Sequence, residues 1–271
     1  MRFGSRSAIT LWSAVLAGMT IAQDASLPVY KPQRSVSGTI RVCGSPQMAD
    51  LLKRYEEGFA KLQPLVHFDD QLKSTMTAVA GVSSGYADIG LLGREIWPEE
   101  EQAFISAKGH VPMVIDVATG SYDVPKATFA LMIFVSRRNP LTSISMEQLE
   151  RIFADNKRPI RTWGELGLSG KWAQRRIHLY GFPTDNDKAR IFSKLVFANG
   201  ERWNGGLKEF GNGADGIDAG QRIVEAIGND PDGIGISNVH YGSEKVKVLA
   251  VASRQGAAVS PNKAIVTDRR G

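Results

Sequence analysis

The stretch that decides the fold is GTIRVCGSP, residues 38–46. Its first half, Thr39–Cys43, has the β-branched composition of a strand, and Gly44 to Pro46 then breaks that strand. Ser45 is a good helix N-cap, and Pro46 suits the first helical position because its missing N–H costs nothing there. Apolar residues follow at the spacing of one helix face: Met48, Leu51, Leu52, Tyr55, Phe59 and Leu62. The stretch predicts a strand, a turn and an amphipathic helix.

The same alternation continues along the chain. Further strands are predicted at residues 65–69, 88–92, 111–117, 131–135, 177–180, 233–237 and 246–251. Helices are predicted at residues 74–84, from 98 onward, at 145–153, 186–198 and 217–227, with a capping box from Ser145 to Gln148. Strands that alternate with helices predict an α/β fold with mostly parallel sheets.

Turn residues divide this pattern into lobes. Residues 118–126 interrupt the alternation and are the best candidate for a crossing between two lobes, and residues 229–233 suggest a second crossing. We therefore expect one lobe from residues 38–120 together with 232–256, and another lobe from residues 125–231. An extended leader (23–37) and a polar tail (257–271) complete the chain.

The first 22 residues have the pattern of a secretory signal. Arg2 and Arg6 are basic, Ala8–Ile21 is largely apolar and uncharged, and Thr20 and Ala22 place small residues before a cleavage site. The apolar run is shorter than the roughly 20 residues of a spanning helix. No cysteine stands directly after this run, so a lipid anchor is disfavoured, and we expect an exported, periplasmic protein.

Composition excludes several classes of protein. The chain has 271 residues, 42% of them hydrophobic, and a net charge of +5, which is ordinary for a globular protein and argues against disorder. A single cysteine, Cys43, excludes an intramolecular disulfide framework, and the four scattered histidines lack metal-binding spacing. The small positive charge gives no support for nucleic-acid binding. We expect no catalytic residues, metal or cofactor, and a monomer.

Small polar residues follow three predicted strands, at residues 44–47, 72–75 and 184–188. In an open α/β sheet, ligands collect beyond the carboxyl ends of the strands, where helix N-termini present free N–H groups. Several such ends that face one cleft make an anion site, whereas each one alone is ordinary capping. The sequence leaves these two interpretations open.

Several stretches, in this order, resemble the phosphate-binding proteins of phosphate ABC transporters, which belong to the type II periplasmic binding proteins. The resemblance covers residues 38–252 and rests on residues 38–45, ADIG at 87–90 with RE at 94–95, NPL at 139–141 with 146–153, WGELG at 163–167 and GIGI at 233–236. It implies two lobes, each a mostly parallel sheet flanked by helices, with a ligand cleft between them. It also implies capture of inorganic phosphate or a related oxyanion for an ABC permease in the inner membrane, without catalysis.

The junctions and the resemblance together give the expected ligand-binding residues: Ser45, Lys73, Ser74, Thr75, Arg94, Asn186 and Lys188. The family's arginine is replaced by Phe182, its Ser-Gly-Thr by residues 186–188, and its phosphate-accepting carboxylate by Gly93. The family also continues beyond the last predicted strand, so we expect a divergent member with a short C-terminus. We therefore expect Asp70, Asp185 or Asp187 to supply the carboxylate that accepts the phosphate proton. The alternative is a binding-fold protein that acts as an envelope scaffold or sensor without transport.

Overall fold

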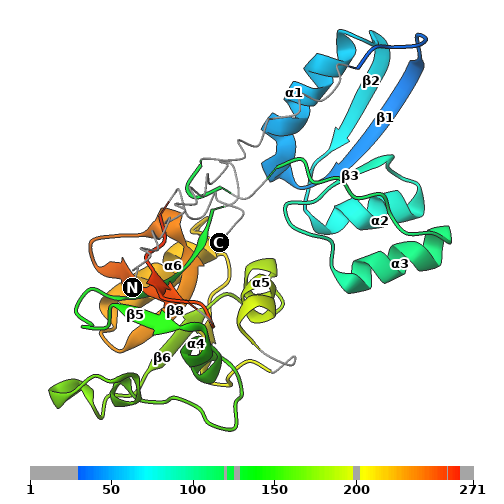
Figure 1. Ribbon diagram of the computed structural model, residues 1–271. Helices are drawn as coiled ribbons and strands as arrows, with labels where there is room; N and C mark the ends of the chain where they lie inside the picture. The colour runs from blue at the N-terminus through cyan, green and yellow to red at the C-terminus, as the bar shows by residue number, and fades with distance from the viewer. Residues whose placement is uncertain (1–29, 119–120, 125–128, 198–201, 255, 263–271) are drawn as a thin grey trace, which may run out of the picture.

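The computed structural model describes residues 30–118, 121–124, 129–197, 202–254 and 256–262. The predicted signal, residues 1–22, the first part of the predicted leader and most of the predicted tail lie outside these ranges. Figure 1 shows two groups of elements, which we call the first lobe (residues 37–108) and the second lobe (residues 131–252). Within the described residues, no helix combines the length and the apolar character needed to cross a membrane.

The first lobe contains a parallel sheet of order β2-β1-β3. Its strands are β1 (Ser37–Gly44), β2 (Leu65–Gln71) and β3 (Ile89–Leu91). Its helices are α1 (Ala49–Ala60), preceded by the 3-10 turn η1 (Pro46–Met48), α2 (Met76–Ser84) and α3 (Pro98–Lys108). The strand, turn and helix predicted from residues 38–62 are thus confirmed.

The second lobe contains a five-stranded sheet of order β7-β6-β8-β4-β9. Its strands are β4 (Leu131–Ser136), β6 (His178–Gly181), β7 (Leu207–Glu209), β8 (Gly233–Asn238) and β9 (Val246–Val248). Strand β6 runs parallel to its neighbours, but β4 runs antiparallel to β8 and β9. The sheet is therefore mixed rather than mostly parallel.

Smaller elements surround this sheet. The helices are α4 (Met146–Phe153), α5 (Asp187–Val196) and α6 (Ala219–Asn229). Strands β5 (Ser143–Ser145), β10 (Ala250–Ala252) and β11 (Ala258–Val259) form a separate small sheet. Three 3-10 turns are described: η2 (Trp163–Leu166), η3 (Gly170–Trp172) and η5 (Val239–Tyr241). The core of this lobe includes the fully buried Trp163, Phe153 and Ile236.

The structure corrects the expected lobe boundaries. Residues 232–256 do not return to the first lobe, because β8 pairs with both β6 and β4 at the centre of the second sheet. All six residues of β8 are buried there. Residues 229–233 therefore form a turn between α6 and β8 within the second lobe instead of a crossing between lobes.

A second correction concerns residues 111–117, which were expected to form a strand. They form no ladder with any described strand, and Val111, Met113 and Ile115 are exposed. A β-branched sequence does not form a strand without a partner to complete its hydrogen bonds and cover its face. Strand β3 consequently lies at an edge of the first sheet.

The capping box expected before α4 is present. The Ser145 hydroxyl accepts a hydrogen bond from the Gln148 N–H at 3.1 Å, and the Gln148 side chain accepts one from the Ser145 N–H at 2.9 Å. Both satisfy donors that have no partner within the helix. The helix then packs Leu149, Ile152 and Phe153 into the core.

Ser145→Ala is expected to lower the free energy of unfolding by about 1 kcal/mol, because one N-cap acceptor is lost. Urea unfolding monitored by circular dichroism measures the change. Ser143→Ala is the matched control, since Ser143 is exposed on the neighbouring strand β5. Equal effects of the two substitutions would contradict a stabilising role for the cap.

Candidate functional site

Three side-chain oxygens converge on Gly93. A Cβ atom added at Gly93 would lie 3.2 Å from the Ser45 Oγ, 3.4 Å from the Thr75 Oγ1 and 3.5 Å from the Gln47 Oε1. The absence of a side chain at Gly93 therefore leaves a small space bordered by two hydroxyls and an amide. This is the position at which the resemblance aligned the family's carboxylate.

The backbone brings Ser45 to this place. Gly44 has a φ of +140°, and a Cβ there would lie 2.2 Å from the Leu91 carbonyl oxygen. Only glycine permits such an approach between the ends of β1 and β3. The Ser45 N–H then donates to the Leu91 carbonyl at 2.9 Å, and the Ser45 side chain is buried.

Neither hydroxyl caps the helix that follows it. Ser45 precedes η1 and Thr75 precedes α2, and both side chains lack a capping hydrogen bond. The hydroxyls therefore keep their hydrogen-bonding capacity, whereas the Thr77 and Ala78 N–H groups of α2 already donate to the Ser74 and Thr75 carbonyls, each at 3.1 Å. The two hydroxyls are neutral donors on one side of Gly93.

Arg94 adds a buried cation next to this space. Only 6% of its side chain is exposed. Its two terminal nitrogens donate to the two carboxylate oxygens of Glu100, each at 2.8 Å, and its Nε lies 3.2 Å from Asp187 Oδ2. Glu100 belongs to α3 and Asp187 begins α5, so Arg94 links the first lobe to the second.

This arrangement shifts the pKa values of both partners. Burial raises the pKa of Glu100, but hydrogen bonds from Arg94 and from the Trp97 N–H lower it more, so it lies below its usual range. Burial lowers the pKa of Arg94, but Glu100 and Asp187 raise it, and the net change is upward. Both groups are therefore charged across the physiological pH range.

The second lobe contributes the loop before α5. The Asn186 side chain caps the helix by accepting a hydrogen bond from the Lys188 N–H at 2.9 Å. The Lys188 Nζ lies 5.2 Å from the centroid of the Phe182 ring, and Phe182 itself is buried. Phe182 thus holds a cation at the position where the family has an arginine.

The seven expected residues divide into two groups. The Ser45 and Thr75 hydroxyls border the space at Gly93, and Arg94 is the next residue of the chain, while Asn186 and Lys188 flank Asp187, its partner on α5. Lys73 is exposed in the loop before α2, and the Ser74 carbonyl accepts the hydroxyl of Thr77 at 2.7 Å. Neither side chain is among the three nearest to the space at Gly93.

Sequence reasoning missed Gln47 and Trp97. Gln47 stands directly after Pro46, within the junction of residues 44–47, but its residue type alone did not indicate a role. Trp97 precedes Pro98 at the start of α3, and the only signal was an aromatic residue beside a helix start. In the structure, the Arg94 Cζ lies 4.6 Å from the centroid of the Trp97 ring.

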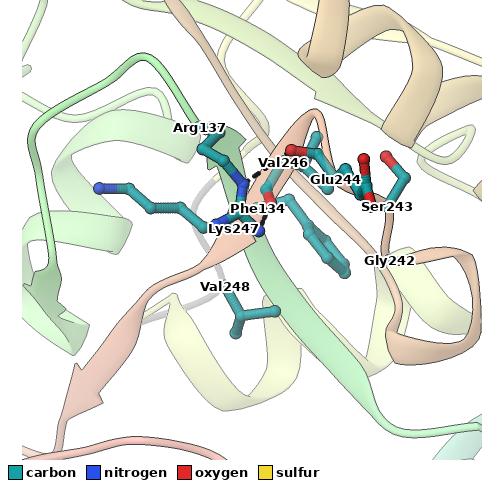
Figure 2. Close-up of a pocket in the computed structure, with 8 residues that line it drawn as sticks. All are labelled: Phe134, Arg137, Gly242, Ser243, Glu244, Val246, Lys247 and Val248. Carbon is teal, nitrogen blue, oxygen red and sulfur yellow. Dashed lines mark hydrogen bonds between the residues drawn. The ribbon is translucent and has the colours of Figure 1, made fainter.

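A separate hollow of about 520 Å³ opens beside β4 and β9 (Figure 2). It contains none of the seven expected residues. Arg137 lies in it, but its guanidinium already donates to the carbonyls of Glu244 and Val246, at 2.7 Å and 3.2 Å. Burial and the nearby Arg137 lower the pKa of Lys247. This hollow therefore lies apart from the residues that the resemblance predicted to bind a ligand.

Comparison with known proteins decides the family. A family model described as the PBP superfamily domain matches residues 31–269. The chain belongs to this family. The resemblance to periplasmic binding proteins stated from the sequence is therefore confirmed.

Curated relatives cover most of this PBP-superfamily chain. The phosphate-binding protein PstS of Pseudomonas aeruginosa is 29% identical over 247 residues, which are 89% of this chain and 71% of that protein. Protein SphX of Synechococcus elongatus is 25% identical over 256 residues, which are 92% of this chain and 69% of that protein.

Solved structures show the same fold. PstS from Borrelia burgdorferi aligns with a TM-score of 0.54 at 14% identity, covering 85% of this chain and 81% of that one. An ABC-type phosphate transport receptor from Vibrio cholerae aligns with a TM-score of 0.52 at 16% identity, covering 82% and 79%. The expected two-lobed α/β fold of type II binding proteins is confirmed.

Glu100→Gln is expected to reduce stability by about 1–3 kcal/mol at about pH 7, because Arg94 loses a charged partner. The folded protein holds the pKa of Glu100 below its usual range, so this stabilisation is present above the unfolded value of about 4.3. It disappears as the pH falls through the folded pKa. Denaturant unfolding at about pH 7 and about pH 2.5 measures both states.

Glu101→Gln is the control, since it removes a charge from the same turn of α3. Its effect should be small at both pH values. A Glu100→Gln effect that stayed constant from neutral to acidic pH would contradict the role given to the Arg94–Glu100 pair.

Proposed function

We propose that this chain is a solute-binding protein that captures a small oxyanion, with phosphate as first choice, at the space around Gly93. The observation that carries the proposal is the convergence of the Ser45 and Thr75 hydroxyls beside the buried Arg94. The membership in the PBP superfamily and the similarity to phosphate-binding PstS support it. No bond is broken in this function, and no cofactor is needed.

The chemistry of the donors suits an oxyanion. Hydroxyls donate hydrogen bonds to anionic oxygens, and a hydrogen bond to a charged group is stronger than one between neutral groups. Arg94 is already paired with Glu100 and Asp187, so the local charge is not positive. Neutral donors, rather than excess positive charge, are therefore the main source of binding energy.

Export and delivery complete the proposal. The signal-like residues 1–22 direct the chain to the periplasm, where it passes the bound anion to an ABC permease. Binding between two lobes suits this task, because hinge closure of lobes encloses a ligand and presents a different surface to a partner.

Ser45→Ala/Thr75→Ala is expected to weaken phosphate binding by about 1–3 kcal/mol, roughly 5- to 150-fold, because two hydrogen bonds to a charged ligand are lost. Isothermal titration calorimetry measures the affinity, and thermal unfolding checks the fold. Thr142→Ala/Ser143→Ala removes the same groups from exposed positions at β5 and is the matched control. Unchanged affinity in the first variant would place the anion elsewhere. No binding in the unmodified chain would favour the scaffold or sensor interpretation.

Selectivity gives a second test, which uses the three aspartates. Of these three, Asp187 forms an ion pair with Arg94, Asp70 interacts with Glu56, and Asp185 is exposed. A monoprotonated phosphate carries a donor that a carboxylate accepts, while sulfate carries none and is repelled. Asp187→Asn is expected to reduce the preference for phosphate over sulfate about tenfold or more. Titrations of both anions into Asp187→Asn, Asp70→Asn and Asp185→Asn measure it. A preference that survives in Asp187→Asn refutes this role.

A further inference from the structure

Helix α5 has two distinct faces. Ala189, Phe192 and Val196 are buried in the second lobe. Asp187, Arg190 and Lys194 lie at spacings of three and four residues, so they share the opposite face of the helix. In Figure 1, α5 lies on the side of the second lobe that faces the first lobe.

The first lobe presents complementary charges to this face from residues 94–100. Arg94 pairs with Asp187, with 3.2 Å between Nε and Oδ2, and Glu99 pairs with Arg190. Farther along α5, Glu95 pairs with Lys194, with 3.3 Å between Oε2 and Nζ. All three ion pairs join one lobe to the other.

Trp97 lies at the centre of these pairs. It is only 5% exposed. The Arg94 Cζ and the Arg190 Cζ lie 4.6 Å and 4.5 Å from the centroid of its ring, and the Lys194 Nζ lies 5.6 Å from it. Each cation is thus within the range of a cation–π interaction, which strengthens when the groups are shielded from water.

Exposed ion pairs contribute little when they stand alone, but several charges arranged as a network contribute more. Here the three ion pairs share one aromatic ring, and the ring is buried by the same side chains that it attracts. The contact is formed entirely by residues of this chain.

We propose that residues 94–100 and α5 form a charge-complementary latch, centred on Trp97, that holds the two lobes together and positions Arg94 before any anion binds. Trp97, Arg190 and Lys194 belong to the latch alone, whereas Arg94 and Asp187 belong both to the latch and to the proposed anion site.

The latch affects affinity, and this consequence rests on the proposed function. When only a fraction of the molecules is closed, the apparent dissociation constant is the intrinsic one divided by that fraction. A fall in the closed fraction from about 90% to about 10% weakens apparent binding about ninefold, although no ligand contact has changed. High salt should have a similar effect, since it screens exposed charges.

The test measures the distance between lobes without any anion. Spin labels are attached to Gly58→Cys in α1 and Lys157→Cys in the second lobe, in the full chain. Gly58 faces open space and Lys157 is exposed, while the native Cys43 is buried and does not compete for the label. Pulsed dipolar spectroscopy then gives the distribution of distances.

The labelled parent is expected to show one short distance. Arg190→Glu should shift the distribution to longer distances, because it places like charges together and removes a cation from Trp97. The charge-exchanged pair Glu99→Arg/Arg190→Glu should recover part of the short distance. Trp97→Ala should also lengthen it, and Trp97→Phe, which keeps an aromatic face, should lengthen it less. Unfolding curves confirm that each variant is folded.

Identical distances in the parent, Arg190→Glu and Trp97→Ala would overturn the latch. So would a failure of the charge exchange to recover any of the short distance. Phosphate titration of the parent is a separate measurement. A parent that is closed but binds no phosphate refutes the proposed function and leaves the latch intact, whereas a parent that binds phosphate but is open without it refutes the latch alone.

Discussion

The buried guanidinium of Arg94 is the constraint on which the rest of the site depends. A buried charge is costly unless it is paired and hydrogen-bonded, and removal of one partner leaves that cost uncompensated. Glu100 from α3 and Asp187 from α5 both form ion pairs with Arg94, so its full pairing requires elements of both lobes. The start of α3, the start of α5 and the residue after Gly93 are thereby fixed relative to one another. The pairing of Arg94 therefore also sets how these parts of the two lobes lie relative to each other.

The departures from the family pattern have a coherent physical meaning. Where the family has an arginine, Phe182 is buried and carries Lys188 above its ring. Where the family has a carboxylate, Gly93 leaves space that the Ser45 and Thr75 hydroxyls border. A charged side chain is thus missing at both positions, and the nearby cation and carboxylate, Lys188 and Asp187, come from a single helix start. In the proposed site, the charges that replace these two therefore lie at the start of α5.

Structural features that depend on residues close together in the chain could be predicted from the sequence. The capping box at Ser145, the strand and turn at residues 38–46 and the helix at α5 each depend on neighbouring residues, and the structure contains all three. The lobe of residues 232–256 was not predictable, because the partner of a buried strand is set by distant pairing rather than by its composition. Residues 111–117 failed as a strand for the same reason. Within the site, Ser45, Thr75 and Arg94 followed from the junctions and the resemblance, but the role of Trp97 depends on a contact between lobes that no local pattern contains.

The two sheets differ in how far along the chain their partners lie, and this has a consequence for the order of folding. Ser37 pairs with Leu65 and Val42 pairs with Ile89, whereas Val135 of the second sheet pairs with Lys247. Closing a longer loop costs more conformational entropy before any stabilising contact forms. Sheets whose strands lie far apart in the sequence therefore form more slowly. The first sheet is complete once residue 91 is available, but the second must wait for β9, close to the end of the described chain. During synthesis from the N-terminus, an early-formed lobe therefore precedes a late one, and Arg94 emerges about ninety residues before the Asp187 that completes its pairing.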